Sequence, residues 1–217
     1  MSEVAALLWQ STLETAYMVS ISALVSGAGG LLLGILLTVT APTRGLFPAF
    51  WIHRVLSVVT NLGRSIPFII LMVAVTPFTR LIVHTSIGTA AAIVPLVIGS
   101  IPYVGRLVES ALREVDPGVV DSVIAMGASP VQIVTKVYLP EALPALCRAM
   151  TIMTITLISF SAMAGAIGGG GLGDLAIRYG YQRFRSDIMA ATVIVLVAIV
   201  QCVQFAGDAL AKRFDRR

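Results

Sequence analysis

The sequence predicts an all-α, polytopic membrane protein with about five transmembrane helices and one insert on the cytoplasmic side. Composition is the first reason: 57% of the 217 residues are hydrophobic, 12% are charged and the mean hydropathy is +0.94, whereas a soluble domain carries about 25% charged residues. The length of the apolar runs is the second reason, because about 20 apolar residues span the hydrocarbon of a bilayer. We therefore expect a single transmembrane domain over residues 1–217, with the insert at residues 106–144.

The first two candidate spans carry signals for packing and bending. In the first, Ser26, Gly30 and Gly34 recur every four residues, which places three small side chains on one helix face and predicts close approach of another helix. In the second, Pro67 predicts a kink, and neighbouring helices or Ser65 are expected to satisfy the freed carbonyl. The five candidate spans are residues 15–40, 55–78, 87–105, 145–167 and 188–207.

The third and fourth spans carry prolines and small polar residues. Pro95 and Pro102 in the third span predict a bent helix. In the fourth span, Ser159, Ser161 and Met163 put small polar and thioether side chains near the expected midplane, where a zwitterionic amino acid with a thioether tail could pass. We take these three residues as candidate pathway residues, with ordinary helix packing as the alternative.

Basic residues predict the orientation, because they favour the cytoplasmic ends of membrane helices. An external N-terminus followed by five crossings leaves Arg80, Arg178, Arg183 and Arg185 outside. The remaining 11 of the 15 lysines and arginines then fall inside: Arg44, Arg54, Arg64, Arg106, Arg113, Lys136, Arg148, Lys212, Arg213, Arg216 and Arg217. We therefore expect a cytoplasmic C-terminus and a cytoplasmic insert. The first ten residues lack the pattern of a cleaved secretory signal, so we expect the N-terminus to be retained.

Several functional classes are not expected from the residues present. The two histidines, His53 and His84, fall on opposite predicted sides of the membrane without a carboxylate or cysteine partner, so no catalytic constellation is predicted. Cys147 and Cys202 lack the paired spacing of a metal or redox motif. The net charge of +4 comes from basic residues spread along the chain rather than from a patch, so no nucleic-acid partner is expected. We expect neither a metal nor a cofactor bound by this chain.

Two glycine-rich motifs bear on nucleotide binding. Gly168, Gly170 and Gly173 match G-x-G-x-x-G, but no strand is predicted before them, so a dinucleotide site is not expected and the glycines instead indicate a tight turn and close helix packing. The sequence has no G-x-x-x-x-G-K-[ST] loop, the motif that cradles ATP phosphates in P-loop proteins. Any ATP-driven work must therefore come from a partner.

The insert contains signals for two short helices joined at a glycine. Asp116 is a candidate N-cap for a helix that Pro117 opens, and Gly127 is a candidate left-handed end. Ser129 then caps a second helix, with Pro130 at its first position and Gln132 completing a capping box. We call residues 116–140 the elbow. A rigid elbow on the cytoplasmic side offers a surface that another protein can push.

The elbow resembles the cytoplasmic "EAA" coupling motif of bacterial ABC importer permeases. That pattern has Glu-Ala-Ala, a glycine four residues beyond the second alanine, and a later isoleucine with Leu-Pro; Gly127, Ile133, Leu139 and Pro140 match it, while the segment 121–123 (DSV) stands in place of Glu-Ala-Ala and keeps the acid. The segments 64–71 (RSIPFIIL), 161–173 (SAMAGAIGGGGLG) and 179–181 (YGY) resemble the permease subunit of methionine ABC importers, and the similarity of segment order extends over nearly the whole chain.

This resemblance implies a type I ABC importer permease in the cell inner membrane. It implies a five-helix, non-catalytic subunit that pairs with a second copy of itself, a cytoplasmic ATPase dimer that uses ATP, and an external methionine-binding protein. Methionine would be taken up in its L form, with the D form as an open alternative. The residues expected to couple to the ATPase are Asp121, Ser122, Ala125, Met126, Gly127, Ala128, Ser129, Ile133, Leu139 and Pro140, with Ile133 and Val137 bracing the elbow against its own helices.

Other interpretations remain open. An ABC permease could take a different amino acid or a quaternary amine, and uptake competition would separate these substrates. An ion-coupled secondary transporter would need no ATPase, but such proteins place acidic residues or broken helices at the midplane, whereas Glu14 and Asp208 lie near predicted membrane edges. A short amphipathic helix lying on the lipid surface explains the same apolar positions of the insert. A membrane scaffold would give no account of the elbow.

Overall fold

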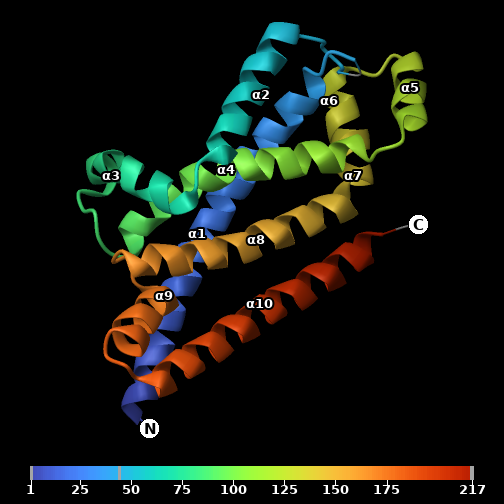
Figure 1. Cartoon of the computed structure of the whole chain (residues 1–217). Coiled ribbons are helices and arrows are strands. Elements are labelled where there is room, and N and C mark those ends of the chain that lie inside the picture. The colour runs from blue at the N-terminus through green and yellow to red at the C-terminus, as the bar shows by residue number, and fades with distance from the viewer. Residues whose placement is uncertain (1, 44, 216–217) are drawn as a thin grey trace. The chain divides into compact units, whose positions relative to one another are not determined.

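The computed structural model describes residues 2–43 and 45–215, and throughout these residues every regular element is a helix (Figure 1). The predicted all-α membrane class is confirmed. Arg44, Arg216 and Arg217, which contribute to the orientation argument, lie outside the described residues. The elements are α1 (Ser2–Val39), α2 (Phe50–Ser65), α3 (Phe68–Val83), α4 (Thr89–Arg113), α5 (Pro117–Ala125), α6 (Pro130–Ile133), the π-helical segment η1 (Val134–Tyr138), α7 (Leu139–Glu141), α8 (Leu143–Ala166), α9 (Gly171–Leu175), the π-helical segment η2 (Ala176–Tyr181) and α10 (Ser186–Phe214).

Within the described residues, four helices, α1, α4, α8 and α10, are long and apolar enough to cross a membrane. They correspond to the first, third, fourth and fifth predicted spans. The pair α2 and α3 makes a fifth span if the two bent helices are counted as one. The predicted number of about five spans therefore agrees with the structure, but several predicted boundaries differ. The helix α1 begins at Ser2 instead of residue 15, and α10 continues to Phe214 instead of ending at residue 207.

The second span is not one kinked helix, as the sequence led us to expect, but two helices interrupted at Ile66 and Pro67. Proline lacks an N–H donor and disfavours helical backbone at the residue before it, so α2 ends at Ser65 and α3 begins at Phe68. The Ser65 hydroxyl donates to the Asn61 carbonyl oxygen at 2.7 Å, in the last turn of α2. The helix α4 also differs from its predicted span, because it continues to Arg113 instead of ending at Gly105.

The chain forms two compact units, and each is built from three separated segments. Unit 1 comprises the segment that ends at Ser26 together with residues 66–100 and 153–204. Its core contains Leu172, Leu175 and Ile188. Partly buried residues near the start of α1 and on α10 pack against this core. In the same unit, Phe68 and Phe160 stack with ring centroids 4.3 Å apart.

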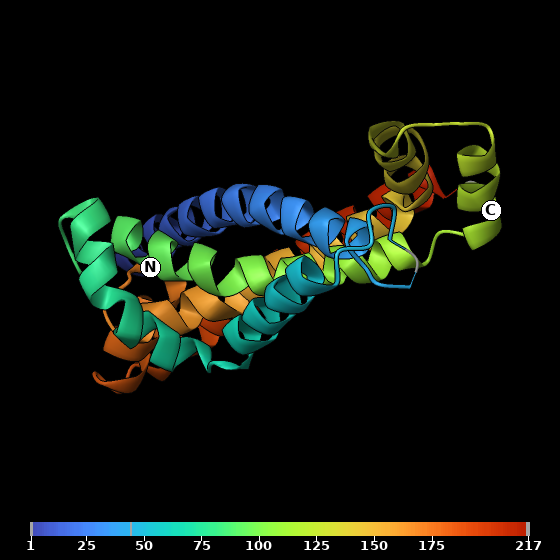
Figure 2. The same cartoon turned by 90° about the horizontal axis from the view of Figure 1, so that it is seen from above.

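Unit 2 comprises residues 27–65, 101–152 and the segment from Phe205 onward. Small residues on α1 allow α4 to approach closely in this unit: a Cβ at Gly30 would lie 2.3 Å from Val104 Cγ1, and a Cβ at Gly34 would lie 2.5 Å from Val108 Cβ. Figures 1 and 2 show α1 (blue) and α4 (green), the two helices that make this contact. The small-residue packing predicted for Gly30 and Gly34 is confirmed.

Candidate functional site

The elbow begins with the helix that the sequence predicts. The Asp116 side chain accepts a hydrogen bond from the Gly118 backbone N–H at 2.7 Å, and Pro117 occupies the first turn of α5. An N-cap carboxylate satisfies one of the backbone donors that a helix leaves unpaired at its start. The cap fixes where the chain leaves α4 and enters α5, because only residues 114–116 connect the two helices.

Gly127 ends this first half of the elbow in a left-handed turn, as predicted, with a φ of +81°. Its backbone N–H donates to the Ile124 carbonyl oxygen at 2.9 Å. No atom lies within 4 Å of the position that a Cβ would take. The requirement for glycine is therefore one of backbone conformation and not of space.

The second half of the elbow opens with the predicted capping box. The Ser129 hydroxyl accepts from the Gln132 backbone N–H at 3.4 Å, and the Gln132 side-chain oxygen accepts from the Ser129 N–H at 2.8 Å. Between α6 and α7 lies the π-helical turn η1, which the sequence did not predict. Figure 1 shows α5 and α6 as separate helices, and the connection between them contains Gly127.

The elbow residues fall into an exposed set and a buried set. Met126 is 77% exposed and Val131 is 72% exposed, so apolar side chains stand in solvent on this insert. Ile133 and Val137 are buried within unit 2. Of the ten residues predicted to couple to an ATPase, the exposed ones are Asp121, Ser122, Ala125, Met126, Gly127, Ser129 and Pro140, the half-buried ones are Ala128 and Leu139, and Ile133 is buried.

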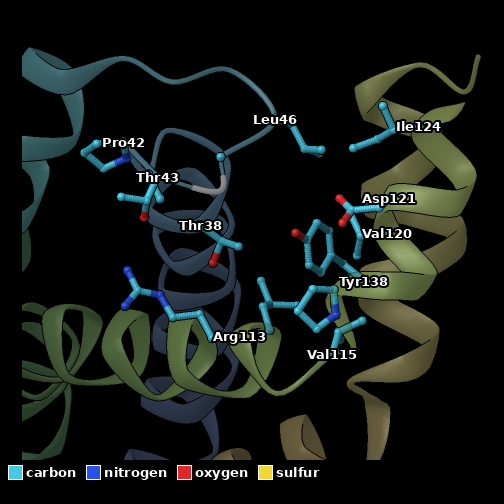
Figure 3. A pocket seen from close by; sticks show the side chains of 14 residues that line it. Thr38, Pro42, Thr43, Leu46, Arg113, Val115, Val120, Asp121, Ile124 and Tyr138 are labelled. Atoms are coloured by element: carbon cyan, nitrogen blue, oxygen red, sulfur yellow. The ribbon is translucent and has the colours of Figure 1, made fainter.

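A cavity of about 700 Å³ lies behind α5, inside unit 2. Figure 3 shows Asp121 and Ile124 of α5 on one side of it and Thr43 and Leu46 of the α1–α2 connection on the other. Tyr138 also lines the cavity, and burial, with a smaller contribution from the Asp121 carboxylate, raises the pKa of its hydroxyl above the ordinary value. The Tyr138 side chain therefore stays neutral at physiological pH.

The structure does not bring the three candidate pathway residues of α8 together. Ser159 and Met163 are one turn apart and exposed, and Met163 is 45% exposed. Ser161 is buried, and its hydroxyl donates to the Ile158 carbonyl oxygen of its own helix at 2.7 Å. The Ser159 hydroxyl likewise donates to a carbonyl of its own helix, that of Ile155, at 3.4 Å. The three residues therefore differ in exposure, and a pathway role for them stays a prediction.

The glycine-rich run forms a tight turn in unit 1, as predicted, with positive φ angles at Gly168, Gly170 and Gly171. Its backbone is held by α1: the Glu14 carboxylate accepts from the Gly171 N–H at 2.8 Å, and the Thr15 hydroxyl accepts from the Leu172 N–H at 2.9 Å. The sequence placed Glu14 only near a membrane edge. No local pattern could have revealed these contacts, because 157 residues separate each donor from its acceptor.

The chain matches the family model described as "Binding-protein-dependent transport system inner membrane component" over residues 30–217. It is 54% identical to the probable D-methionine transport system permease protein MetI of Vibrio cholerae over 211 residues, which cover 97% of this chain and 93% of that protein. It is 43% identical to the methionine import system permease protein MetP of Bacillus subtilis over 210 residues, which cover 97% and 94% of the two chains.

Solved structures give the same result. A chain from inward-facing conformations of the MetNI methionine ABC transporter superposes with a TM-score of 0.97 at 45% identity, and the match covers all of both chains. A chain of an amino acid ABC transporter superposes with a TM-score of 0.75 at 19% identity, covers 100% of this chain and 96% of that chain, and shares the fold alone. The resemblance stated from the sequence is confirmed. The chain belongs to the binding-protein-dependent transport system inner membrane component family, and it is a membrane-embedded transport subunit with the fold of a type I ABC importer permease.

Proposed function

We propose that this chain is the permease subunit through which an ATP-driven importer takes up methionine across the inner membrane. The observation that carries the proposal is the match over the full chain length to the permease of a solved methionine ABC transporter. Two relatives that cover nearly the whole chain also have names that specify methionine. The substrate includes L-methionine, and the name of the Vibrio cholerae relative supports D-methionine as a second substrate.

The ATPase that drives uptake is a separate subunit that docks on the elbow. The sequence contains no P-loop, so ATP is bound and hydrolysed by the partner. The exposed apolar side chains of Ile124, Met126 and Val131 stand outside the membrane-spanning helices, and exposed apolar side chains gathered in this way are typical of a protein interface. Two copies of this permease would present two elbows to an ATPase dimer.

The elbow is connected to two long helices by short links. Residues 114–116 connect α4 to α5, and Ala142 alone separates α7 from α8. Closure of the ATPase dimer on ATP would move the two elbows together, and such short links pass the displacement to α4 and α8. Alternating access then requires two packings of these helices and no chemistry in this chain.

The same proposal fixes the orientation and the external partner. The N-terminus is external and the C-terminus cytoplasmic, so that the elbow faces the ATPase and residues 168–187 face an external methionine-binding protein. The distribution of arginines and lysines supports this orientation. Ser159 and Met163 on the exposed face of α8 are the proposed pathway residues, because a hydroxyl and a polarizable thioether suit a zwitterion with a thioether tail.

Reconstitution tests the proposal directly. The permease, its ATPase and its binding protein are placed in proteoliposomes, with ATP on the ATPase side and labelled methionine with the binding protein on the other. We expect methionine to enter only with hydrolysable ATP, and we expect unlabelled methionine to compete better than other amino acids or quaternary amines. A membrane lacking the ATPase is the control.

Two outcomes would contradict the proposal. Uptake that is independent of ATP but follows an ion gradient would indicate a secondary transporter. An interrupted helix pair such as α2–α3 also occurs in secondary transporters. Family membership nevertheless favours the ATP-driven class. ATP-dependent uptake of a different solute, with no competition by methionine, would leave an ABC permease and refute the substrate.

A further inference from the structure

Arg106 of α4 holds α2 by several hydrogen bonds within unit 2. Its guanidinium donates from Nη2 to the Ser57 carbonyl oxygen at 3.1 Å, to the Ser57 hydroxyl at 2.5 Å and to the Asn61 side-chain oxygen at 3.1 Å. Ser57 and Asn61 lie one turn apart on α2. One arginine of α4 therefore forms hydrogen bonds with two successive turns of the neighbouring helix.

A buried carboxylate fixes the position of this guanidinium. Glu109 is 4% exposed, and its two oxygens pair with two arginines of the same helix: Oε2 with Arg106 at 2.5 Å and Oε1 with Arg113 at 2.6 Å. Arg113 is 57% exposed, whereas Arg106 is 19% exposed. Charge-assisted hydrogen bonds are stronger where water is excluded, so the pair with Arg106 is the stronger of the two.

A second contact between these two helices is apolar. A Cβ at Gly63 of α2 would lie 2.8 Å from Pro102 Cγ of α4, so the helices touch there without a polar bond. Apolar surfaces of this kind can slide or rotate against each other, because dispersion forces are not directional. The Arg106 hydrogen bonds are directional and give the two helices a fixed register.

We propose that Arg106 is the positioning residue that makes α2 follow α4 when the elbow moves, and that Glu109 holds its guanidinium in place for this task. The inference rests on the proposed function, because it assigns a step in ATP-driven transport. Arg106 lies about two turns before Arg113, and residues 114–116 then lead into the elbow. A displacement of the elbow therefore reaches Arg106 through one rigid stretch of helix, and Arg106 passes it to α2.

The test uses the complete transporter with its ATPase and binding protein, and it measures ATP hydrolysis, methionine uptake and the melting temperature of each variant complex. Three variants test these contacts. Arg106→Gln removes the positive charge and the guanidinium, and Arg106→Lys keeps the charge without the planar fork. The double variant Ser57→Ala with Asn61→Ala removes the side-chain acceptors on α2 while the ion pair with Glu109 remains. Ser65→Ala is the matched control, since its hydroxyl bonds to a carbonyl of its own helix.

We expect the number of methionine molecules taken up per ATP hydrolysed to fall about tenfold in Arg106→Gln, the equilibrium change that loss of a charge-assisted hydrogen bond produces. ATP hydrolysis should persist, Arg106→Lys should restore part of the ratio, and the double variant should change it in the same direction as Arg106→Gln. If Arg106→Gln fails to assemble, the double variant alone decides the question.

The results separate the two proposals. If the wild-type transporter takes up no methionine with ATP, the proposed function fails and this inference falls with it. If the wild-type transporter works and the assembled double variant keeps the wild-type ratio, only the role of Arg106 is refuted. A fall of uptake and hydrolysis in equal proportion, together with a lower melting temperature, would show a purely structural role and would also refute it.

Discussion

The carboxylate of Glu14 accepts a hydrogen bond from the backbone N–H of Gly171, at 2.8 Å. This contact joins the first helix of the chain to the glycine-rich turn at the start of α9, within unit 1. Gly171 has a φ of +75° and Gly170 a φ of +78°. With these positive φ angles the backbone N–H groups do not follow the hydrogen-bonding pattern of a regular helix. The acidic side chain supplies the acceptor that this turn needs.

Glu14→Ala should therefore destabilise the protein by about 1–3 kcal/mol, because a partly buried N–H loses a charged acceptor. Glu14→Gln should cost about 1 kcal/mol or less, since an amide oxygen can still accept but carries no charge. Thermal unfolding of the purified protein in detergent measures both. Glu141→Ala, which removes an exposed carboxylate elsewhere, is the control and should change stability by no more than about 0.5 kcal/mol. Equal effects of all three substitutions would refute the role of Glu14.

Gly127→Leu should leave the protein inserted in the membrane but uncouple ATP hydrolysis from methionine uptake. The φ of +81° at Gly127 costs an L-residue about 1–2 kcal/mol, which the elbow can relieve by changing the angle between α5 and α6. Because no atom lies within 4 Å of the added Cβ, the change acts on the turn and not on packing. The measurement is uptake per ATP hydrolysed by the reconstituted complex.

Gly88→Leu is the matched control for this prediction. Gly88 has a φ of +98° and equally open surroundings, but it precedes α4 in unit 1 and lies outside the elbow. The substitution therefore imposes a similar backbone strain at a different place. Normal coupling in Gly127→Leu, or the same loss of coupling in Gly88→Leu, would contradict the assignment of Gly127 to the coupling surface.

Gly34→Ala should destabilise unit 2 by about 2–3 kcal/mol because it forces α1 away from α4. The new Cβ would lie 2.5 Å from Val108 Cβ and 2.8 Å from the Gly105 carbonyl oxygen, which is a backbone atom and cannot turn aside. Gly29→Ala on the same helix would meet only the flexible end of Ile101, at 3.1 Å. We expect it to be neutral or stabilising by up to about 1 kcal/mol, since alanine favours helix more than glycine. Unfolding in detergent compares the two, and equal melting temperatures would refute the prediction.

Ser159→Ala and Met163→Ala should change the KM for methionine uptake, whereas Ser161→Ala should not. The first two side chains are exposed on α8 and the third is buried against its own helix. A loss of one contact to the substrate is worth about 1 kcal/mol, which corresponds to an approximately fivefold change in KM. Transport assays over a range of methionine concentrations measure this. A KM that changes only in Ser161→Ala would reverse the assignment.

The elbow could be predicted from the sequence because its shape depends on neighbouring residues. Asp116 bonds to Gly118, and Ser129 exchanges bonds with Gln132. These contacts span two or three positions, so that residue types and spacing define them completely. The conformation of Gly127 follows from the same local rules, since a left-handed helix end favours glycine.

The π-helical turns and the interruption at Pro67 were less accessible. The sequence predicted a change of direction at Pro67 but not whether the helix would bend or stop. Each hydrogen bond of a π-helical segment such as η1 spans one residue more than in an α-helix, and Val137 and Tyr138 of η1 are buried. Pro67 is a local signal for a change of direction, whereas the π-helical turn has no local sequence signal.

The sequence by itself determined the membrane class, the approximate spans, the elbow and the row of small residues on α1, because hydrophobicity, capping and helical periodicity act over a few neighbouring positions. Only the tertiary structure decided that Arg106 forms hydrogen bonds with Ser57 and Asn61 and that Glu14 accepts one from Gly171. It also decided that Ser161 is buried while Ser159 is exposed. The first two contacts join residues 45 or more positions apart, and burial on α8 depends on which helices pack against it. The physical reason is that side-chain partners are selected by packing in three dimensions, which local residue patterns do not encode.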